Sequence, residues 1–319
     1  MNNQEILQQL DEYVVGHETA KKALIALITR SKLRHYQKYI SCVNDEYLLT
    51  PMKILLMGSS GSGKTHLLES LRRITPFPLV RIDATQLMPA GASGGINPAS
   101  LVKMIGEEVK ACLADSPLTY FSFDGALDQT VVFIDEIDKL SHSWEGSGNW
   151  NRHVQSNFLT LFDHKNELSG VSFIFAGAFS ALTDTVPDKN QIGFSKSSND
   201  DKDISCLDDR LVKHGLIPEL VGRLTHIIEL DKFTVDVYYH IITTRLLPKK
   251  YMDMAAYGVL EEDIKPLSEQ ELRTMAKYAH KSNLGVRALQ RELDKHFLLA
   301  EFDAGLNLEL FDGCFLEQI

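Results

Sequence analysis

The sequence predicts an α/β protein in which a five-stranded parallel sheet is flanked by helices and followed by a smaller, mainly helical domain. Five short apolar segments have the length and composition of buried strands, and helical or loop sequence separates each one from the next. After Asp231 the strand pattern stops, and only stretches with helical spacing follow. The expected strands are residues 52–58, 79–84, 130–136, 171–178 and 225–230.

This change of pattern sets the domain organisation. A chain of 319 residues is longer than one typical domain, so we expect a large domain over residues 1–230 and a small helical domain over residues 231–319. Ser268 is followed three residues later by Glu271, a capping-box pattern that predicts the start of a helix. The polar stretch 187–209 is rich in turn-forming residues and is predicted to be a long loop. The expected helices are residues 18–40, 235–247, 268–280 and 286–304.

The composition predicts a globular protein of the reducing cytoplasm. No stretch reaches the roughly 18 apolar residues of a membrane helix, and the polar, acidic start argues against a signal peptide or membrane anchor. The net charge of −10 argues against a broad nucleic-acid-binding surface, although a local basic lining stays compatible with it. The four cysteines lie far apart without a C-x-x-C pair, which argues against a zinc site and a disulfide framework. They are Cys42, Cys112, Cys206 and Cys314.

The strongest motif is GSSGSGKT, which fits the phosphate-binding pattern G-x-x-x-x-G-K-[ST] and lies between an expected strand and a helix. Its glycines let backbone N–H groups turn inward around phosphates. Lys64 is placed to reach the terminal phosphates of ATP, and the Thr65 hydroxyl to ligate Mg²⁺. The predicted phosphate-binding loop, or P-loop, consists of Gly58, Ser59, Ser60, Gly61, Ser62, Gly63, Lys64 and Thr65.

A second motif is the pair of carboxylates, Asp135 and Glu136, that ends the expected strand at 130–136. An acidic pair after a strand is usually part of a solvated loop, but the P-loop elsewhere in the sheet reverses that expectation. We expect Asp135 to hold the Mg²⁺ through water, and Glu136 to orient and polarise the water that attacks the γ-phosphate. The two motifs together predict ATP hydrolysis.

Further segments occur in an order typical of one family. LDEYVVGHETAKKAL, which starts at Leu10, is followed by IDATQLMPAG, VVFIDEIDKL, FIFAGAF, IGF and GLIPELVGRL. With these motifs in register, the chain from about Leu10 to about Leu299 resembles the AAA+ ATPases, and among them the ClpX and HslU protein-unfolding subunits. The resemblance implies a P-loop AAA+ module with a smaller C-terminal helical domain.

The resemblance also assigns roles to residues that carry no signal alone. It implies that Val14 and Val15 pack on the adenine of ATP. It implies that Arg223 is the arginine finger, which completes the ATP site of the neighbouring subunit, and that Arg287 is the sensor through which the small domain detects the γ-phosphate. A finger supplied in trans is worth roughly three to five orders of magnitude in rate in other nucleotide hydrolases. Hydrolysis is therefore expected to require a homo-oligomeric ring, which the family builds as a hexamer.

The loop AGASGGIN departs from the family pattern. In ClpX-like unfoldases the first channel loop carries an aromatic and then an aliphatic residue that wedge against the substrate chain, and the aligned residues here are Ala92 and Ser93. A buried tyrosine covers on the order of 150 Å², so these small side chains lack the usual contact area. A second channel segment from Ser141 offers either another kind of grip or the anchors of a surface loop, and both interpretations stay open. Its aromatic and basic residues are Trp144, Trp150, Arg152 and His153.

Three other features bear on partners. The chain starts directly at the ATPase core, where ClpX has a zinc domain, so substrate choice is expected to come from elsewhere. The first sensor position, usually polar in the family, falls on Ala176 and Gly177, and no residue is assigned that role. Ile192, Gly193 and Phe194 match the tripeptide with which ClpX docks on the peptidase ClpP. The alternative, that Ile192 and Phe194 pack on the subunit's own surface, stays open.

The leading functional hypothesis is an ATP-hydrolysing, ring-forming protein that remodels or unfolds proteins and delivers them to a ClpP-type peptidase. The alternative is an ATP-switched protein that changes the conformation of one partner without threading a chain. A third hypothesis is a DNA-handling AAA+ protein such as a helicase loader, against which the acidic charge and the ClpX-type register weigh.

Overall fold

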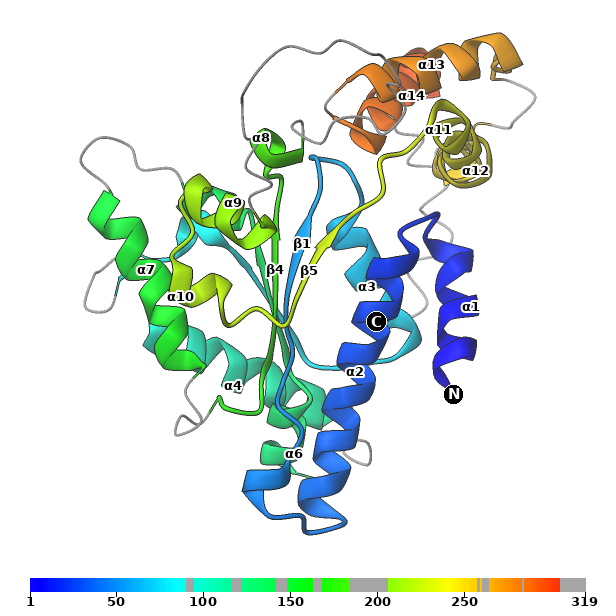
Figure 1. Ribbon diagram of the computed structural model, residues 1–319. Coiled ribbons are helices and arrows are strands. Elements are labelled where there is room, and N and C mark those ends of the chain that lie inside the picture. Colours follow the sequence, from blue (N-terminus) through cyan, green and yellow to red (C-terminus); the bar gives the residue numbers. More distant parts are fainter. Residues whose placement is uncertain are drawn as a thin grey trace, which may run out of the picture. The chain divides into compact units, whose positions relative to one another are not determined.

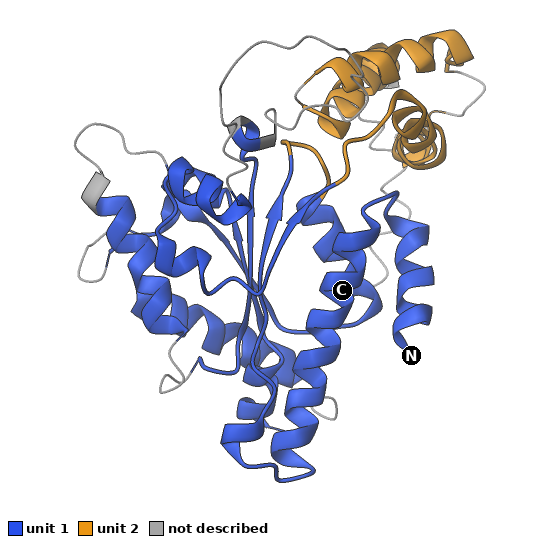
Figure 2. Ribbon diagram, viewed as in Figure 1, with its two compact units in different colours: residues 1–58, 64–230 blue, residues 59–63, 231–319 orange. Residues whose placement is uncertain are grey.

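The computed structural model of the chain consists of two compact units (Figures 1 and 2). Unit 1 comprises residues 1–58 and 64–230, and unit 2 comprises residues 59–63 and 231–319. None of the helices in the described ranges combines the length and the low charge of a membrane span. The structure describes residues 1–89, 95–115, 122–141, 148–162, 168–183, 206–256, 259, 264–282 and 284–304.

Unit 1 is built on a five-stranded parallel sheet with the strand order β2-β3-β4-β1-β5. This sheet confirms the predicted α/β class, and each strand falls within a segment expected from its apolar pattern. Because all strands are parallel, the loops that follow β1, β3 and β4 leave from the same edge of the sheet. The strands are β1 Lys53–Met57, β2 Leu79–Asp83, β3 Val131–Asp135, β4 Ser172–Gly177 and β5 His226–Glu229.

Helices cover both faces of the sheet (Figure 1), because alternate strand residues point to opposite sides. Ile54 and Leu56 of β1 pack with helices α1, α2 and α3, whereas Leu55 and Met57 pack on the other face. The helices on the first face are α1 Asn3–Tyr13, α2 Glu18–Tyr39 and α3 Lys64–Ile74. Those that contribute to the second core are α4 Pro98–Asp115, α6 Phe123–Asp128, α7 Gly148–Leu161, α9 Leu207–His214 and α10 Pro218–Val221.

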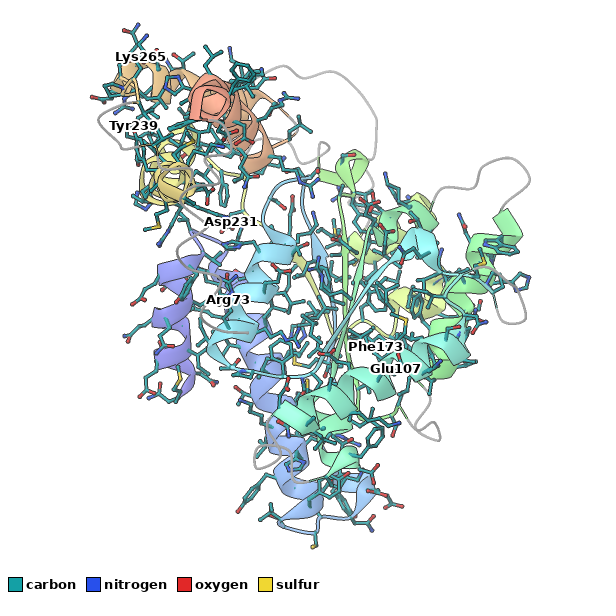
Figure 3. All side chains as sticks on the ribbon, turned by 180° about the vertical axis from the view of Figure 1, so that it is seen from behind. Arg73, Glu107, Phe173, Asp231, Tyr239 and Lys265 are labelled. Carbon is teal, nitrogen blue, oxygen red and sulfur yellow. The ribbon has the colours of Figure 1, made fainter. Side chains whose placement is uncertain are left out.

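Aromatic rings fill much of the second core. Phe173 of β4, labelled in Figure 3, packs edge to face on Phe162 with 5.0 Å between ring centroids. Phe175 meets Phe158 of α7 in the same manner at 5.3 Å. Edge-to-face ring pairs add to the free energy of simple burial, so α7 is held firmly against β4. Short helices connect the larger elements: η1 Asp45–Tyr47, η2 Ala84–Gln86, η3 Ile137–Leu140 and α8 Ser180–Thr183.

Unit 2 is helical in its described part beyond Asp231. The expected helix over 235–247 is longer than predicted and runs on to Ala256, with a π-helical stretch before Pro248. A proline has no N–H group to donate to the preceding turn, and a local change of helical register accommodates that loss. The capping box of Ser268 and Glu271 is present as predicted. The elements are α11 Val235–Ile241, η4 Ile242–Leu246, α12 Leu247–Ala256, α13 Glu269–Lys281 and α14 Val286–Ala304.

The long loop expected over 187–209 is shorter at its end than predicted. Helix α9 begins at Leu207, with Asp208 and Asp209 in its first turn. Carboxylates in a first turn are stabilised by the exposed N–H groups of the helix, which explains why this polar sequence can start a helix. The earlier part of the stretch, up to residue 205, lies outside the described residues.

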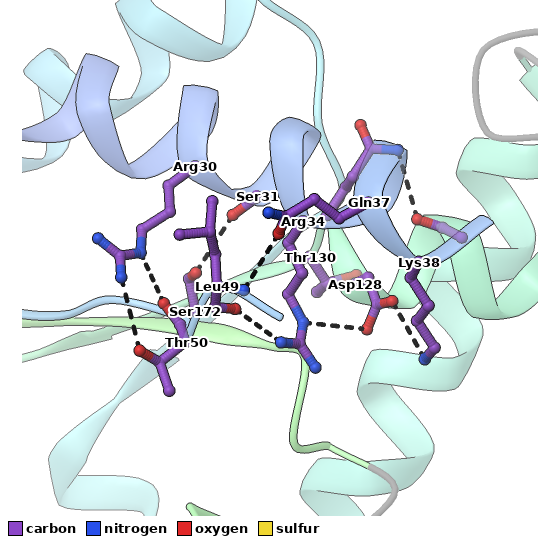
Figure 4. A network of polar contacts seen from close by, with 12 residues as sticks. Arg30, Ser31, Arg34, Gln37, Lys38, Leu49, Thr50, Asp128, Thr130 and Ser172 are labelled. Atoms are coloured by element: carbon purple, nitrogen blue, oxygen red, sulfur yellow. Dashed lines mark hydrogen bonds and ion pairs between the residues drawn. The ribbon is translucent and has the colours of Figure 1, made fainter. Parts of the chain in front are cut away.

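A group of polar contacts fixes α2 at the amino end of the sheet (Figure 4). Arg34 Nη1 donates to the carbonyl oxygen of Leu49 at 2.6 Å, and Arg30 Nε donates to that of Thr50 at 2.7 Å. The buried carboxylate of Asp128 lies 3.3 Å from Lys38 Nζ and 4.0 Å from Arg34 Nε. These residues of α2 thereby hold both the segment before β1 and the end of α6. We call Arg30, Arg34, Lys38 and Asp128 the amino-end clamp.

We predict that Asp128→Ala lowers the free energy of unfolding by about 3 kcal/mol, because it leaves two partly buried cations beside an empty space. The matched control is Lys103→Ala, which removes an exposed i,i+4 pair with Glu107 and should cost about 0.5 kcal/mol or less. Denaturant unfolding of the nucleotide-free chain measures both. Equal losses for the two variants contradict the assignment of the clamp.

Candidate functional site

The P-loop leaves β1 at the sheet edge where β4 also ends. The N–H of Gly58 donates to the carbonyl oxygen of Gly177 at 3.1 Å, which extends the β1–β4 pairing by one residue. Helix α3 begins at Lys64, and the Lys64 Nζ donates to the carbonyl oxygen of Gly58 at 2.6 Å. The ammonium group is therefore folded back over the start of the loop.

The middle of the P-loop, Ser59–Gly63, belongs to unit 2 and contacts the start of α14. The N–H of Val286 donates to the carbonyl oxygen of Gly61 at 3.2 Å. Gly61 has a left-handed φ of 72°, and a Cβ at this position would lie 2.1 Å from the carbonyl oxygen of Leu284. Only glycine allows this approach, so residue 61 of the motif serves the packing against α14 as well as the loop conformation.

Two residues that the sequence predicts to act on the phosphates meet in this part of unit 2. The Arg287 Nη1 donates to the Ser60 Oγ at 2.8 Å. The contact joins residues 227 positions apart in the chain. Arg287 therefore contacts the Ser59–Gly63 part of the P-loop, which belongs to the same unit.

The Thr65 hydroxyl, from the first turn of α3, and the Asp135 carboxylate, at the end of β3, lie close together. The Thr65 Oγ1 donates to the Asp135 Oδ2 at 3.2 Å, across the intervening strand β4. Hydroxyl and carboxylate oxygens are the ligands that Mg²⁺ takes beside phosphate oxygens and water. The donor set therefore fits the predicted metal.

The backbone of Glu136 is strained. The residue is exposed and adopts φ 57° and ψ 33°, a left-handed conformation that is costly for residues other than glycine. Its N–H donates to its neighbour's carboxylate, Asp135 Oδ1, at 2.9 Å. Such strain is concentrated at functional sites, because a fixed side-chain direction there outweighs the cost.

The predicted adenine-binding residues lie close in space to the P-loop helix. His66, the residue after Thr65, has its Nε2 3.2 Å from the carbonyl oxygen of Tyr13, so the imidazole donates this hydrogen bond. Tyr13 directly precedes Val14, which is buried, and Val15, which is half-buried. No residue pattern singles out His66, because its partner is a backbone atom of a distant segment.

Arg223 lies at the opposite end of the sheet. It precedes Thr225, whose N–H donates to the carbonyl oxygen of Lys53, the first residue of β1, at 2.7 Å. Burial, and then the positive charge of Arg223, lower the pKa of Lys53. The exposed guanidinium donates through Nη1 to the carbonyl oxygen of Leu159 at 3.2 Å. Strand β1 spans roughly 15 Å. The Arg223 side chain, at the amino end of β1, therefore cannot reach Lys64 beyond the carboxyl end of the same strand.

The first sensor position carries no polar side chain of its own. Ala176 and Gly177 are the last residues of β4 and pair with Leu56 and Met57 of β1. The polar group beside them is the carboxylate of Asp138, whose Oδ1 accepts the N–H of Ala178 at 3.2 Å. Asp138 lies two residues after Glu136 in the same acidic motif, and its place in that motif could have identified it from the sequence.

The two segments predicted to line a channel lie only partly within the described residues. Ala92, Ser93, Trp144 and the tripeptide Ile192–Phe194 lie outside the described residues. The two ends of the first loop are joined, since the N–H of Met88 donates to the carbonyl oxygen of Ile96 at 2.8 Å. In the second segment, Trp150, Arg152 and His153 are exposed, whereas Asn151 is half-buried and Ser141 is buried.

The fold and these contacts define a P-loop nucleotide-binding protein. Residues 54–190 match the family model described as "ATPase family associated with various cellular activities (AAA)". The ATP-dependent Clp protease ATP-binding subunit ClpX 2 of Wolinella succinogenes is 30% identical, over 92% of this chain and 75% of its own length. The ClpX subunit of Treponema denticola is 27% identical, over 94% of this chain and 77% of its own length.

The chain therefore belongs to the AAA family of ATPases, in the branch of the ClpX subunits. This confirms the resemblance found from the motifs. Membership of the family implies ATP hydrolysis.

The backbone at Glu136 leads to a stability prediction. Glu136→Gly is expected to raise the free energy of unfolding by about 1 kcal/mol relative to Glu136→Gln, because glycine adopts the left-handed conformation without strain. Both variants lack the carboxylate, so the comparison isolates the backbone. Denaturant unfolding without nucleotide gives the two values, and a glycine variant no more stable than the glutamine variant refutes the strain.

Proposed function

We propose that this chain is a ring-forming ATPase that remodels or unfolds proteins. In this proposal, residues 1–230 form the nucleotide-binding domain and residues 231–319 form the small domain that responds to the nucleotide. The observation that carries the proposal is that Arg223 lies at the opposite end of the sheet from the place where Thr65 meets Asp135 in the same chain. The ClpX relatives are named ATP-binding subunits of an ATP-dependent protease, which supports a protein as substrate.

The residues of one chain divide the work on ATP. Val14 and Val15 hold the adenine, and the P-loop N–H groups hold the phosphates. Lys64 leaves the carbonyl oxygen of Gly58 and binds the terminal phosphates, since a phosphate oxygen is a stronger partner for an ammonium group than a neutral carbonyl. Thr65 would hold the Mg²⁺ directly and Asp135 through water, and the ion would neutralise charge on the phosphates.

Hydrolysis needs a base and a further positive charge. Glu136 is fixed by its backbone at the end of β3 and is exposed, so it can orient and polarise the attacking water. Arg223 supplies charge stabilisation to the ATP site of the next subunit, and Arg287 responds to the γ-phosphate in its own chain. ATP turnover in this scheme requires neighbouring subunits, as in a homo-hexameric ring.

A peptidase partner is part of the proposal. The relatives are named as subunits of the Clp protease, and Ile192, Gly193 and Phe194 match the tripeptide with which ClpX docks on its peptidase. We propose that these three residues dock on a ClpP-type peptidase, which degrades what the ring unfolds.

A second candidate function is an ATP-switched remodeller that threads no chain and has no peptidase. Ala92 and Ser93 favour it, because neither side chain can wedge against an extended polypeptide. The two candidates share the ATP chemistry and differ in what the channel does.

We predict that Glu136→Gln and Arg223→Ala each bind ATP and assemble, yet lose turnover. The loss is expected to be at least 100-fold for the glutamine variant, which lacks the base, and about 1,000-fold for the alanine variant, which lacks the finger. Nucleotide binding, sedimentation and ATPase assays measure the three properties. A normal turnover rate in either variant contradicts the mechanism.

A separate test addresses the channel loop. The double variant Ala92→Tyr with Ser93→Val should raise the rate of ATP-dependent unfolding of a tagged fluorescent protein if the ring threads its substrate, because it restores the missing contact area. Ala92→Ser is the matched control and should change nothing. If the double variant hydrolyses ATP normally and its unfolding rate does not rise, the switch hypothesis is favoured.

A further inference from the structure

A single buried amide connects three segments of unit 1. Gln155 of α7 is 1% exposed. Its Nε2 donates to the carbonyl oxygens of Leu140 at 3.0 Å and Gly215 at 3.1 Å, and its Oε1 accepts the N–H of Ile217 at 2.7 Å. All three of these hydrogen bonds join the Gln155 amide to backbone atoms. Gln155 therefore fixes the backbone positions of two chain segments relative to α7.

The two segments lead to two different residues of the proposed mechanism, Glu136 and Arg223. Leu140 ends η3, a turn that begins immediately after Glu136. Ile217 is the N-cap of α10, which ends at Val221, two residues before Arg223. Gln155 therefore links the acidic pair of a subunit's own ATP site to the segment that carries its arginine finger.

Neighbouring contacts strengthen this link. The Ser141 Oγ, next to Leu140, lies 2.8 Å from His214 Nδ1. Gly215 has a φ of 117°, and a Cβ there would lie 1.8 Å from the carbonyl oxygen of Ser141, so the two segments are in direct backbone contact. One turn further along α7, Arg223 itself donates to the carbonyl oxygen of Leu159. A buried polar network that is fully paired makes the elements it joins move together.

We infer that Gln155 is a positioning residue that couples the ATP site of one subunit to the arginine finger that the same subunit gives to its neighbour. The inference rests on the proposed function and deepens it, since it names the connection between two sites of the ring. A shift of the end of β3 on nucleotide binding would move η3, and the hydrogen bond from Gln155 to Leu140 would move α7 with it. The hydrogen bond from Ile217 to Gln155 would then move the start of α10, and with it Arg223. Each subunit's finger thus follows the state of its own nucleotide.

Gln155→Met is the variant of choice, because methionine has a similar volume and fills the same buried space. The substitution removes the three hydrogen bonds that the amide makes to the carbonyl oxygens of Leu140 and Gly215 and to the N–H of Ile217. Ser156→Ala is the matched control, since Ser156 is the next residue of α7, is exposed and bonds only within its helix. Both are made in the full-length chain.

The experiment uses mixed rings. Glu136→Gln subunits keep Arg223 but cannot hydrolyse ATP, and Arg223→Ala subunits keep the acidic pair but give no finger. A one-to-one mixture is expected to regain hydrolysis where a glutamine-variant subunit lends its finger to an alanine-variant subunit. Gln155→Met is then placed in either the finger donor or the finger acceptor, and the ATPase rate and the thermal unfolding of each subunit are measured.

We expect Gln155→Met in the donor to lower the regained rate at least 10-fold and in the acceptor less than threefold, with Ser156→Ala neutral in both. Equal losses in donor and acceptor, or no loss in the donor, overturn the inference and leave the proposed function standing. If the simple mixture regains no hydrolysis, the finger in trans fails, and the inference fails with it. If the methionine variant does not fold, Ser141→Ala breaks the second link and must show the same asymmetry between donor and acceptor.

Discussion

The structure depends on one constraint, the parallel sheet that brings the ends of β1 and β3 to one edge with β4 between them. That edge places the Thr65 hydroxyl 3.2 Å from the Asp135 carboxylate, although the residues are 70 positions apart in the chain. Side chains alternate along a strand, so a register shift of one residue in β3 would turn Asp135 to the other face of the sheet. The contact between Thr65 and Asp135 therefore depends on the register of buried strands as well as on the loops.

The same sheet separates the P-loop and the acidic pair from Arg223. The P-loop and the acidic pair leave its carboxyl edge, whereas Arg223 and the amino-end clamp lie where the strands begin. The clamp secures α2 at that end, and the aromatic contacts of Phe158 and Phe162 secure α7 against β4. Arg223 is thereby held about one strand length from the Thr65–Asp135 contact of its own chain. This separation is the basis of the proposal that Arg223 acts in a neighbouring subunit.

Much of this could be predicted from the sequence, for physical reasons that differ between elements. The strands of the sheet are short apolar runs between polar segments, and their burial requires that pattern. The P-loop glycines and Lys64 could be predicted because a phosphate demands those residue types at that spacing. The extension of the helix past residue 247 was missed, since a proline usually ends a helix and here a π-helical stretch accommodates it.

Other features of the site could not be predicted, because they depend on backbone atoms of distant segments. The three partners of Gln155 lie 15, 60 and 62 positions away and are all main-chain groups, which no residue pattern identifies. The left-handed backbone of Glu136 is equally hidden, since nothing in the sequence marks a glutamate as strained. The role of Gly61 in admitting Leu284 also needed the structure, although the motif had already fixed it as a glycine.

The measurement that tests the central claim most directly is the ATPase rate per chain as a function of protein concentration, with sedimentation at each concentration. In the proposed mechanism, one chain lacks the positive charge that completes its own site. The rate per chain is therefore expected to be negligible where the protein is monomeric and to rise steeply as rings form. A rate per chain that stays constant down to concentrations where only monomers sediment would contradict it.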